Sequence, residues 1–586
     1  MVFLFLCKFN FSMSLNAHIQ PAVRIFLPQD FVLTTWEAVE PYFEQLVAAP
    51  INDKRQLEQW LQQWSELEAV ISEDACWRQI KMTCDTTDPA LEEAFNYFCL
   101  EIEPKLKPYN NRLQQKLMDS PFTKELDHAQ YFPLLRQIEN ALSLYREENV
   151  ALEAQLSVLQ QQYGVISSKM TITVNDQLYT LQQAAKFLQE PDRKLREEVF
   201  VKVNERRGED RAELDKLFDQ LLVLRQQIAE NAGFDNYRDY KFRALGRFDY
   251  TPEDCYNFHE AVKTHILPLQ ERLLEHRRKQ LGLEVLRPYD VDAVPENEQP
   301  LKPFTNGTDM LDKSIEVFSK LHPYFGDCLQ VMQGMQRLDL DSRIGKAPGG
   351  YNCPLAETGV PFIFMNAVGT INDVITMMHE GGHAIHSFQS HHLPLSAFKE
   401  YPMEIAELAS MSMELFSMDH WDIFMPEAND LLKAKQEELE RVIDVLPWIA
   451  TIDKFQHWIY THPGHTVAER TEAWKSIFME FAPKNIDRSG QEQYFEANWQ
   501  RQLHLYEVPF YYIEYGIAQL GAVAMWRQYK ANPQETLQRY LDALALGYTK
   551  TLPELYQTAG IRFSFDAEYI QELKGFLEGE LAAVGL

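Results

Sequence analysis

The chain has 586 residues, of which 45% are hydrophobic, so it can bury a large core. Its formal net charge is −30 and it has no Lys/Arg-rich block, which argues against nucleic acid and anionic membranes as partners. Its seven cysteines are scattered and form no CxxC pair, a pattern typical of a reducing cytosol, so we expect a cytoplasmic protein.

The first residues carry no clear targeting signal. Val2 to Leu6 is apolar, but it is too short for a membrane span and no basic residues precede it. Met13 is a possible true start, and we expect residues 1–12 to be disordered. No later segment has about 18 unbroken apolar residues, so the sequence predicts a soluble protein.

The rest of the chain is dominated by hydrophobic patterns with the period of an α-helix. One hairpin is predicted, with strands at 171–174 and 177–180 joined by Asn175 and Asp176. Residues 287–309 are rich in proline and polar residues and predict a loop. Helical stretches are predicted at 34–107, 135–165, 182–232, 252–280, 309–336, 427–460, 516–547 and 566–584.

The most informative motif is HExxH, formed by His379, Glu380 and His383. Residues four apart lie on the same face of a helix, so both imidazoles can point at one metal ion. Imidazole nitrogens suit Zn²⁺, and the glutamate between them can take a proton from a water at the metal. Three fixed residues occur by chance in some chains of this size, so the neighbouring sequence has to support the motif.

The neighbouring sequence predicts a buried helix around this motif. Thr370 to Asp373 supplies side-chain oxygens where a helix would begin, and an apolar body follows. Gly381 and Gly382 cost helix stability, roughly 1 kcal/mol each relative to alanine. A glycine pair inside a buried helix indicates that another backbone or a substrate packs very close.

A catalytic zinc site needs a third protein ligand. The metzincin pattern requires Gly at 386 and His at 389, whereas the chain has His386 and Gln389. Thermolysin-like sites place a glutamate roughly 18–20 residues past the second histidine, where this chain has no carboxylate. A second helix is predicted after Pro402, with three glutamates on roughly one face. Spacing alone does not choose between Glu404 and Glu407, and Glu414 lies on the same face.

Here the sequence resembles a known family. HEGGHAIHSF followed by AELASMSME is similar to the oligoendopeptidase F branch of the thimet oligopeptidase superfamily of zinc peptidases. In that superfamily the third ligand is the glutamate of an E-x-x-S segment, so the resemblance implies Glu407 as the ligand. It also implies that His386 is no ligand and either orients one or packs beside it.

A segment rich in histidine and tyrosine lies further along the chain, at residues 504–516. By itself it is compatible with an aromatic core helix. It resembles the family's C-terminal His-and-Tyr motif, which implies that His504 contacts substrate and that Tyr512 and Tyr515 stabilise the oxyanion. Tyr511 remains an alternative, because the spacing from histidine to tyrosine differs between branches of the superfamily.

Two segments precede the HExxH helix. Gly349, Gly350 and Tyr351 resemble the family's glycine-and-tyrosine loop and are expected to bind substrate. Residues 361–366 predict a short strand, and Pro361 is compatible with a sheet edge that can pair with an extended peptide. A structural hairpin without substrate contact is the alternative.

The sequence therefore predicts a mostly α, two-lobed helical metallopeptidase with a deep central cleft and a small β element beside the metal-binding helix. We expect a helical N-terminal region at 1–110, an oligoendopeptidase-type helical domain with the hairpin at 111–200, and a catalytic domain at 201–586. One Zn²⁺ per chain, an oligopeptide substrate and cleavage of internal peptide bonds are what the resemblance implies. A dipeptidyl-carboxypeptidase and an inactive helical binding protein are the alternatives, and the oligomeric state is not predicted.

Overall fold

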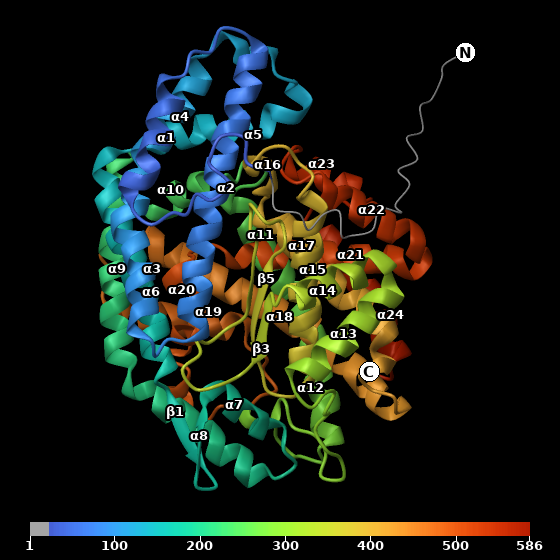
Figure 1. Cartoon of the computed structure of the whole chain (residues 1–586). Helices are drawn as coiled ribbons and strands as arrows, with labels where there is room; N and C mark the ends of the chain where they lie inside the picture. Colours follow the sequence, from blue (N-terminus) through green and yellow to red (C-terminus); the bar gives the residue numbers. More distant parts are fainter. Residues whose placement is uncertain (1–22) are drawn as a thin grey trace.

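A computed structural model describes residues 23–586, so the expectations for residues 1–12 and for Met13 lie outside the described residues. The described chain is mostly helical, and the long helices stack around a central pair, α15 (Ile371–Ser390) and α17 (Met403–Ser417) (Figure 1). This arrangement confirms the predicted fold class. No helix within residues 23–586 has the length and apolar character needed to span a membrane.

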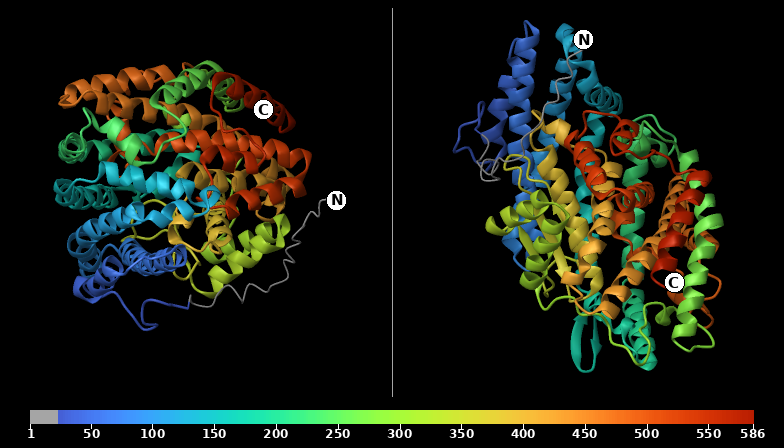
Figure 2. Two further views of the ribbon diagram at one scale, coloured as in Figure 1. Left: turned by 90° about the horizontal axis from the view of Figure 1, so that it is seen from above. Right: turned by 90° about the vertical axis from the view of Figure 1, so that its right-hand side faces the viewer.

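The N-terminal helices form one end of the molecule (Figure 2). Their own hydrophobic core runs from Leu27 to Ile138 and is completed by Leu393, Leu395 and Phe398 from the segment that follows α15. These helices are α1 (Trp36–Ala48), α2 (Lys54–Cys84), α3 (Pro89–Tyr97), α4 (Glu103–Asp119) and α5 (His128–Leu144).

A second and larger core begins at Leu156 and extends to Leu581. The predicted hairpin is confirmed, with Thr171 paired to Thr180 and positive φ angles at both turn residues, Asn175 (49°) and Asp176 (60°). The elements of the first half of this part are α6 (Glu147–Ser168), β1 (Thr171–Val174), β2 (Gln177–Thr180), α7 (Leu181–Ala185), α8 (Arg193–Glu209), α9 (Arg211–Asn231), α10 (Tyr237–Ala244), α11 (Pro252–Ala261), α12 (Leu267–Gln280), α13 (Gly307–Leu321) and α14 (Pro323–Gly334).

The second half of this part carries the helices that build the site. Besides α15 and α17, its helices are α16 (Ser396–Lys399), α18 (Ala428–Thr461), α19 (Val467–Phe481), α20 (Leu503–Glu507), α21 (Tyr512–Ala531), α22 (Pro533–Ala545), α23 (Leu552–Thr558) and α24 (Ala567–Ala583). The division at residues 110 and 200 stays a prediction.

A three-stranded sheet lies beside α15, formed by β3 (Leu338–Asp341), β4 (Tyr351–Cys353) and β5 (Phe362–Ala367) (Figure 1). Its order is β3-β5-β4, so β5 is the central strand, parallel to β3 and antiparallel to β4. The short strand predicted at 361–366 is confirmed as β5, but the expectation that it lies at a sheet edge is wrong. The edge nearest in sequence to the glycine loop is β4, because strand order depends on distant pairings that a local pattern does not encode.

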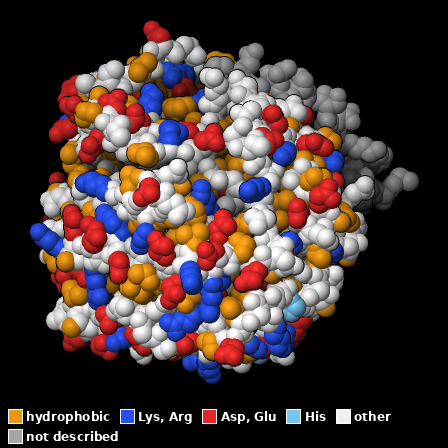
Figure 3. All heavy atoms as spheres, turned by 90° about the horizontal axis from the view of Figure 1, so that it is seen from below, with side chains coloured by type: hydrophobic (Ala, Val, Ile, Leu, Met, Phe, Trp, Pro, Cys, Tyr) orange, Lys and Arg blue, Asp and Glu red, His pale blue; other side chains and the backbone are white. Residues whose placement is uncertain are grey.

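Two cavities lie beside the loop at Gly349, and both include this residue in their walls; together they are called the cleft here. One, of about 550 Å³, is lined by residues of α6, α8 and the segment 493–503. The other, of about 620 Å³, is lined by residues of α12, α15 and α18. Outside the cleft, acidic and basic side chains are intermixed with neutral and apolar ones on the face seen from below (Figure 3).

Candidate metal centre

The helix α15 begins where the sequence predicted. The carboxylate of Asp373 accepts hydrogen bonds from the backbone N–H groups of Val368 (3.0 Å), Gly369 (2.9 Å) and Thr370 (2.8 Å), which fixes the first turn. The apolar body of the helix is buried. His379 and His383 therefore emerge on one face, with ring centroids 4.8 Å apart.

Glu407 of α17 meets these two histidines. Its Oε2 lies 3.2 Å from Nε2 of His379 and 3.7 Å from Nε2 of His383. Among residues 23–586, these three side chains form one of two groups whose ligand atoms all lie within 4.8 Å of one another. The other group, Cys255, Asp453 and His457, is entirely buried and lies elsewhere in the fold.

The two other glutamates on this face of α17 have different partners. Glu404 accepts a hydrogen bond from the hydroxyl of Tyr250 at 2.7 Å and takes no part in the histidine cluster. Glu414 contacts His379 from the opposite side of the ring, with Oε1 2.5 Å from Nδ1, and is itself paired with Arg441. Spacing placed Glu414 on the correct face, but only the structure shows that it orients a histidine.

The glycine pair marks a close helix crossing. A Cβ at Gly382 would lie 2.6 Å from Cα of Ser410 and 2.8 Å from the carbonyl oxygen of Ala409, both in α17. A Cβ at Gly381 would lie 2.4 Å from the ring of Phe318. The predicted tight packing is therefore confirmed, and its partners are a backbone and an aromatic ring. This crossing brings Glu407 to the histidines.

Glu380 lies beside this cluster without a fixed partner for one oxygen. The residue is 5% exposed, and its Oε2 has no hydrogen-bond partner among the described residues. Burial raises the pKa of Glu380 to about 7. A carboxyl group of this kind can accept and return a proton near neutral pH.

The His-and-Tyr segment faces the same cluster. His504 of α20 lies with Nε2 3.1 Å from the hydroxyl of Tyr515, and burial lowers its pKa to about 4, so its ring is neutral. Tyr511 donates its hydroxyl to Oε1 of Glu407 at 2.5 Å. The hydroxyl of Tyr512 is bound instead to the side-chain oxygen of Gln502 at 3.0 Å. The structure thus gives the three tyrosines different partners, whereas the sequence favoured Tyr512 and Tyr515 and kept Tyr511 as an alternative.

Two features in or next to this segment were not predicted from the sequence. Gln502 connects the group, because its amide Nε2 lies 2.8 Å from Nδ1 of His504. Phe510 has a positive φ of 69°, a strained conformation for this residue, and its backbone is held by Gln456 and Arg247. This turn immediately before α21 sets the directions of Tyr511 and Tyr512, and no sequence signal specifies it.

The glycine loop lies next to Glu380. A Cβ at Gly350 would lie 3.8 Å from Oε1 of Glu380, so the loop approaches the carboxylate closely. Gly349 has φ +102°, which favours glycine, and has open space around it. The ring of Tyr351 stacks on Phe364 and its hydroxyl contacts that of Thr83 in α2 at 2.6 Å. Tyr351 therefore joins the sheet to the N-terminal helices.

His386 lies outside the ligand cluster. It is fully buried, and its ring stacks on Tyr401 with centroids 3.4 Å apart. This contact is the packing role that the family resemblance implied.

Solved structures share this fold over most of the chain. A structure of PZ peptidase A with an inhibitor is 28% identical, with a TM-score of 0.90, and the match covers 95% of this chain and 98% of that one. A putative oligoendopeptidase F from Bacillus anthracis strain Ames is 25% identical, with a TM-score of 0.85, and the match covers 95% and 97% of the two chains.

Comparison of sequences finds relatives of the same kind as the structural comparison. An oligoendopeptidase F homolog of Lactococcus lactis is 25% identical over 53% of this chain and 51% of its own length, and the oligopeptidase PepF of Bacillus subtilis is 22% identical over 80% and 68%. The matches span about half the length of the first of these relatives. The profile of the peptidase M3 N-terminal domain matches residues 26–145, and that of peptidase family M3 matches residues 186–575. Because the second match covers more than half of the sequence, this chain belongs to peptidase family M3.

Proposed function

We propose that this protein is a zinc-dependent endopeptidase that hydrolyses internal peptide bonds of short unfolded oligopeptides. The observation that carries the proposal is the convergence of His379, His383 and Glu407 on one point, with the buried carboxylate of Glu380 beside them. Membership of peptidase family M3 and the similarity to oligoendopeptidase F proteins support the same activity.

The donor set fits one Zn²⁺ ion. Two imidazole nitrogens and one carboxylate oxygen are a ligand set typical of catalytic zinc, and three protein ligands leave a position open. The contact between His379 and Glu414 leaves Nε2 of that ring for the metal. When bound, zinc would polarise the scissile carbonyl and lower the pKa of the attacking water.

The protein groups around the metal centre have separate proposed roles. Glu380 accepts the proton of the attacking water and passes it to the leaving amine. Tyr515 and His504, joined by their hydrogen bond, donate to the oxyanion and hold the substrate carbonyl. Tyr511 positions Glu407 and stays close enough to contact substrate. Tyr512, predicted as a further donor, acts in this arrangement through Gln502 and His504.

We propose that the substrate backbone lies along Gly349, Gly350 and the edge strand β4. An edge strand offers unpaired N–H and C=O groups to an extended peptide, and Gly350 lies against Glu380. Tyr351 would support this strand from behind through its contact with α2. Pairing in this way requires an unfolded substrate, because a folded protein cannot present a free extended strand inside a cleft.

Composition and cysteine state bear on partners and location. We propose oligopeptides, and neither nucleic acid nor membranes, as partners, supported by the strongly acidic composition. A cytoplasmic location is supported by six cysteines within residues 23–586, all of them unpaired. The domain division at 1–110, 111–200 and 201–586 is retained as a proposal.

A digest of a mixed peptide library, with and without a chelator, tests the function directly. We expect internal cleavage of short peptides that the chelator abolishes and added zinc restores. Glu380→Gln should keep its zinc and lose activity by about 100- to 10,000-fold, because the proton acceptor is lost while the ligands remain. Cleavage by this variant at nearly the wild-type rate would contradict the mechanism.

The same experiment separates the alternatives. A dipeptidyl-carboxypeptidase would release only dipeptides from the C-terminus, and mass spectrometry of the products identifies them. An inactive binding protein would show neither bound metal nor chelator-sensitive cleavage after purification without added zinc.

A further inference from the structure

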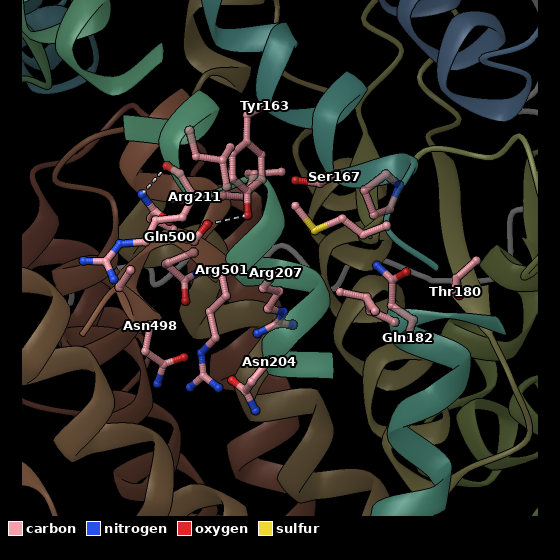
Figure 4. A pocket seen from close by; sticks show the side chains of 18 of the residues that line it. Tyr163, Ser167, Thr180, Gln182, Asn204, Arg207, Arg211, Asn498, Gln500 and Arg501 are labelled. Carbon is pink, nitrogen blue, oxygen red and sulfur yellow. Dashed lines mark hydrogen bonds between the residues drawn. The ribbon is translucent and has the colours of Figure 1, made fainter. Parts of the chain in front are cut away.

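The wall of the 550 Å³ cavity beside the metal centre carries several arginine side chains (Figure 4). It is bounded by α6, α8, the hairpin region and the short 3-10 helix η9 (Asn498–Arg501). Gln502 is part of its wall and also contacts His504, so the cavity adjoins the group proposed to hold the scissile carbonyl.

Two arginines from different elements project into this cavity. Arg207 comes from the last turns of α8, and Arg501 ends η9. Their guanidinium groups face the same space, with the amide of Asn204 beside them (Figure 4). Arg501 is exposed and Arg207 half-buried, so both can be reached from the cavity.

Neither arginine has a carboxylate partner. Within residues 23–586, no side-chain hydrogen bond or ion pair is formed by Arg207 or by Arg501, and Arg501 packs over the ring of Trp448, 4.3 Å from its centroid. Arg211, which lines the same cavity, is by contrast paired with Glu496 at 3.2 Å. Lys346, which also lines the cavity, is paired with Asp339 at 2.8 Å. The only free cations described at this wall are therefore Arg207 and Arg501.

The surroundings make these two charges costly to hold. The pKa of Arg501 is lowered to about 10, first because the surrounding cavity wall limits the hydration of its guanidinium group and then by repulsion from Arg207. Burial also lowers the pKa of Arg207. Asp292 acts favourably on Arg501 but forms no ion pair with it. Two mutually repelling guanidinium groups without a counter-ion are an arrangement that an anionic ligand would relieve.

A carboxylate matches this arrangement chemically. Guanidinium groups bind carboxylates through paired charge-assisted hydrogen bonds, and two of them can enclose one anion. Every unmodified peptide carries such a group at its C-terminus, and acidic side chains supply the same chemistry. We propose that Arg207 and Arg501 form a subsite that binds a carboxylate of the peptide substrate. This inference rests on the proposed peptidase function and adds a charged anchor to it.

The test uses peptides that differ in one group. The first pair is a quenched fluorescent peptide without Asp or Glu, prepared as the free acid and as the C-terminal amide. In the second pair both peptides are C-terminal amides, and one carries a Glu where the other carries a Gln. The wild-type protein should show kcat/KM about 10- to 100-fold higher for the free acid over the amide, or for the Glu peptide over the Gln peptide. The pair that shows the preference identifies the source of the carboxylate.

The variants Arg207→Gln and Arg501→Gln should reduce this ratio towards one and leave cleavage of the uncharged amide near the wild-type level. Arg501→Lys should retain part of the preference, because it keeps the charge and loses the paired hydrogen bonds. Arg206→Gln is the matched control, since Arg206 is the neighbour of Arg207 on α8 and pairs with Asp210. This control should keep the full ratio.

The outcomes separate the two proposals. Equal cleavage of all four peptides by the wild-type protein, or an undiminished preference in Arg207→Gln and Arg501→Gln, overturns the carboxylate subsite and leaves the peptidase function standing. Cleavage of none of them contradicts the peptidase function. Binding of the same peptides to Glu380→Gln, measured by fluorescence anisotropy, reports on the subsite without turnover. Equal affinity for acid and amide in that measurement also overturns it.

Discussion

Oε1 of Glu414 lies 2.5 Å from Nδ1 of His379, on the side of the imidazole opposite to Glu407. This contact selects the tautomer in which Nδ1 carries the proton and Nε2 has a free lone pair. Arg441 pairs with Glu414 and thereby holds it in place. The metal centre is thus supported by a second layer of charged residues on α17 and α18.

Replacing Glu414 should weaken metal binding without removing a ligand. We expect Glu414→Gln to bind zinc about 10- to 100-fold less tightly, because an amide orients the imidazole less strongly than a carboxylate does. Competition with a chromogenic chelator measures the change. Glu404→Gln is the control on the same helix, since Glu404 bonds to Tyr250 and lies outside the cluster. Equal zinc affinity of Glu414→Gln and the wild-type protein would show that the contact has no role in metal binding.

Gly382 should tolerate no side chain. In Gly382→Ala the new methyl group would collide with the backbone of α17 at Ser410, and backbone cannot move aside as a flexible side chain can. We expect a loss of about 1–3 kcal/mol in the free energy of unfolding, together with weaker zinc binding as the two helices separate. Thermal unfolding and zinc titration measure both effects.

The matched control for this change is Gly575→Ala. Gly575 lies inside α24, and a methyl group added there would have no atom within 4 Å, so alanine should be neutral or stabilise by about 0.4–1 kcal/mol. If both variants unfold alike, the close crossing of α15 and α17 does not limit the residue at 382.

The three tyrosines should give three different phenotypes when changed to phenylalanine. Tyr515→Phe should lower kcat by about 100- to 1,000-fold with little change in KM, because it removes a proposed oxyanion donor. Tyr511→Phe should weaken zinc binding, since it removes a hydrogen bond to Glu407. Tyr512→Phe should have the smallest effect on kcat, because its hydroxyl bonds to Gln502. Steady-state kinetics with zinc titration distinguishes them, and a larger kcat loss in Tyr512→Phe than in Tyr515→Phe would reverse the assignment.

Glu68 should make stability depend on pH. Burial and the nearby charge of Glu400 raise the pKa of Glu68 to about 8. As pH rises from 4.5 to 8, the unfolded carboxyl loses its proton while the folded one keeps it, so folding becomes less favourable. Glu68→Gln should therefore stabilise the fold at pH 9 by on the order of 1 kcal/mol, which is seen as a higher melting temperature. At pH 5 the melting temperature should change much less.

The control for Glu68 is Glu58→Gln on the same helix. The side chain of Glu58 is 44% exposed and pairs with Lys54 at 3.6 Å, so its replacement should leave the pH profile of the melting temperature unchanged. A profile for Glu68→Gln that runs parallel to that of the wild-type protein would show that Glu68 ionises normally in the fold.

The sequence by itself determined the local elements of the site. The helical period places His379 and His383 on one face of α15, and Thr370 and Asp373 mark where that helix begins, because these are properties of a single helix. The glycine pair also predicted close packing. Glycine lowers the stability of a helix, so two of them inside a buried helix indicate that another group approaches closely. The hairpin at 171–180 followed from its turn residues.

Only the tertiary structure decided the relations between distant segments. The crossing of α15 and α17 brings Glu407, and not Glu404, to the histidines, and the turn at Phe510 directs Tyr511 and Tyr512 to different partners. The order β3-β5-β4 made the predicted edge strand central. Spacing along a chain fixes directions within one element, whereas contacts between elements depend on packing angles and strand order that no local pattern records.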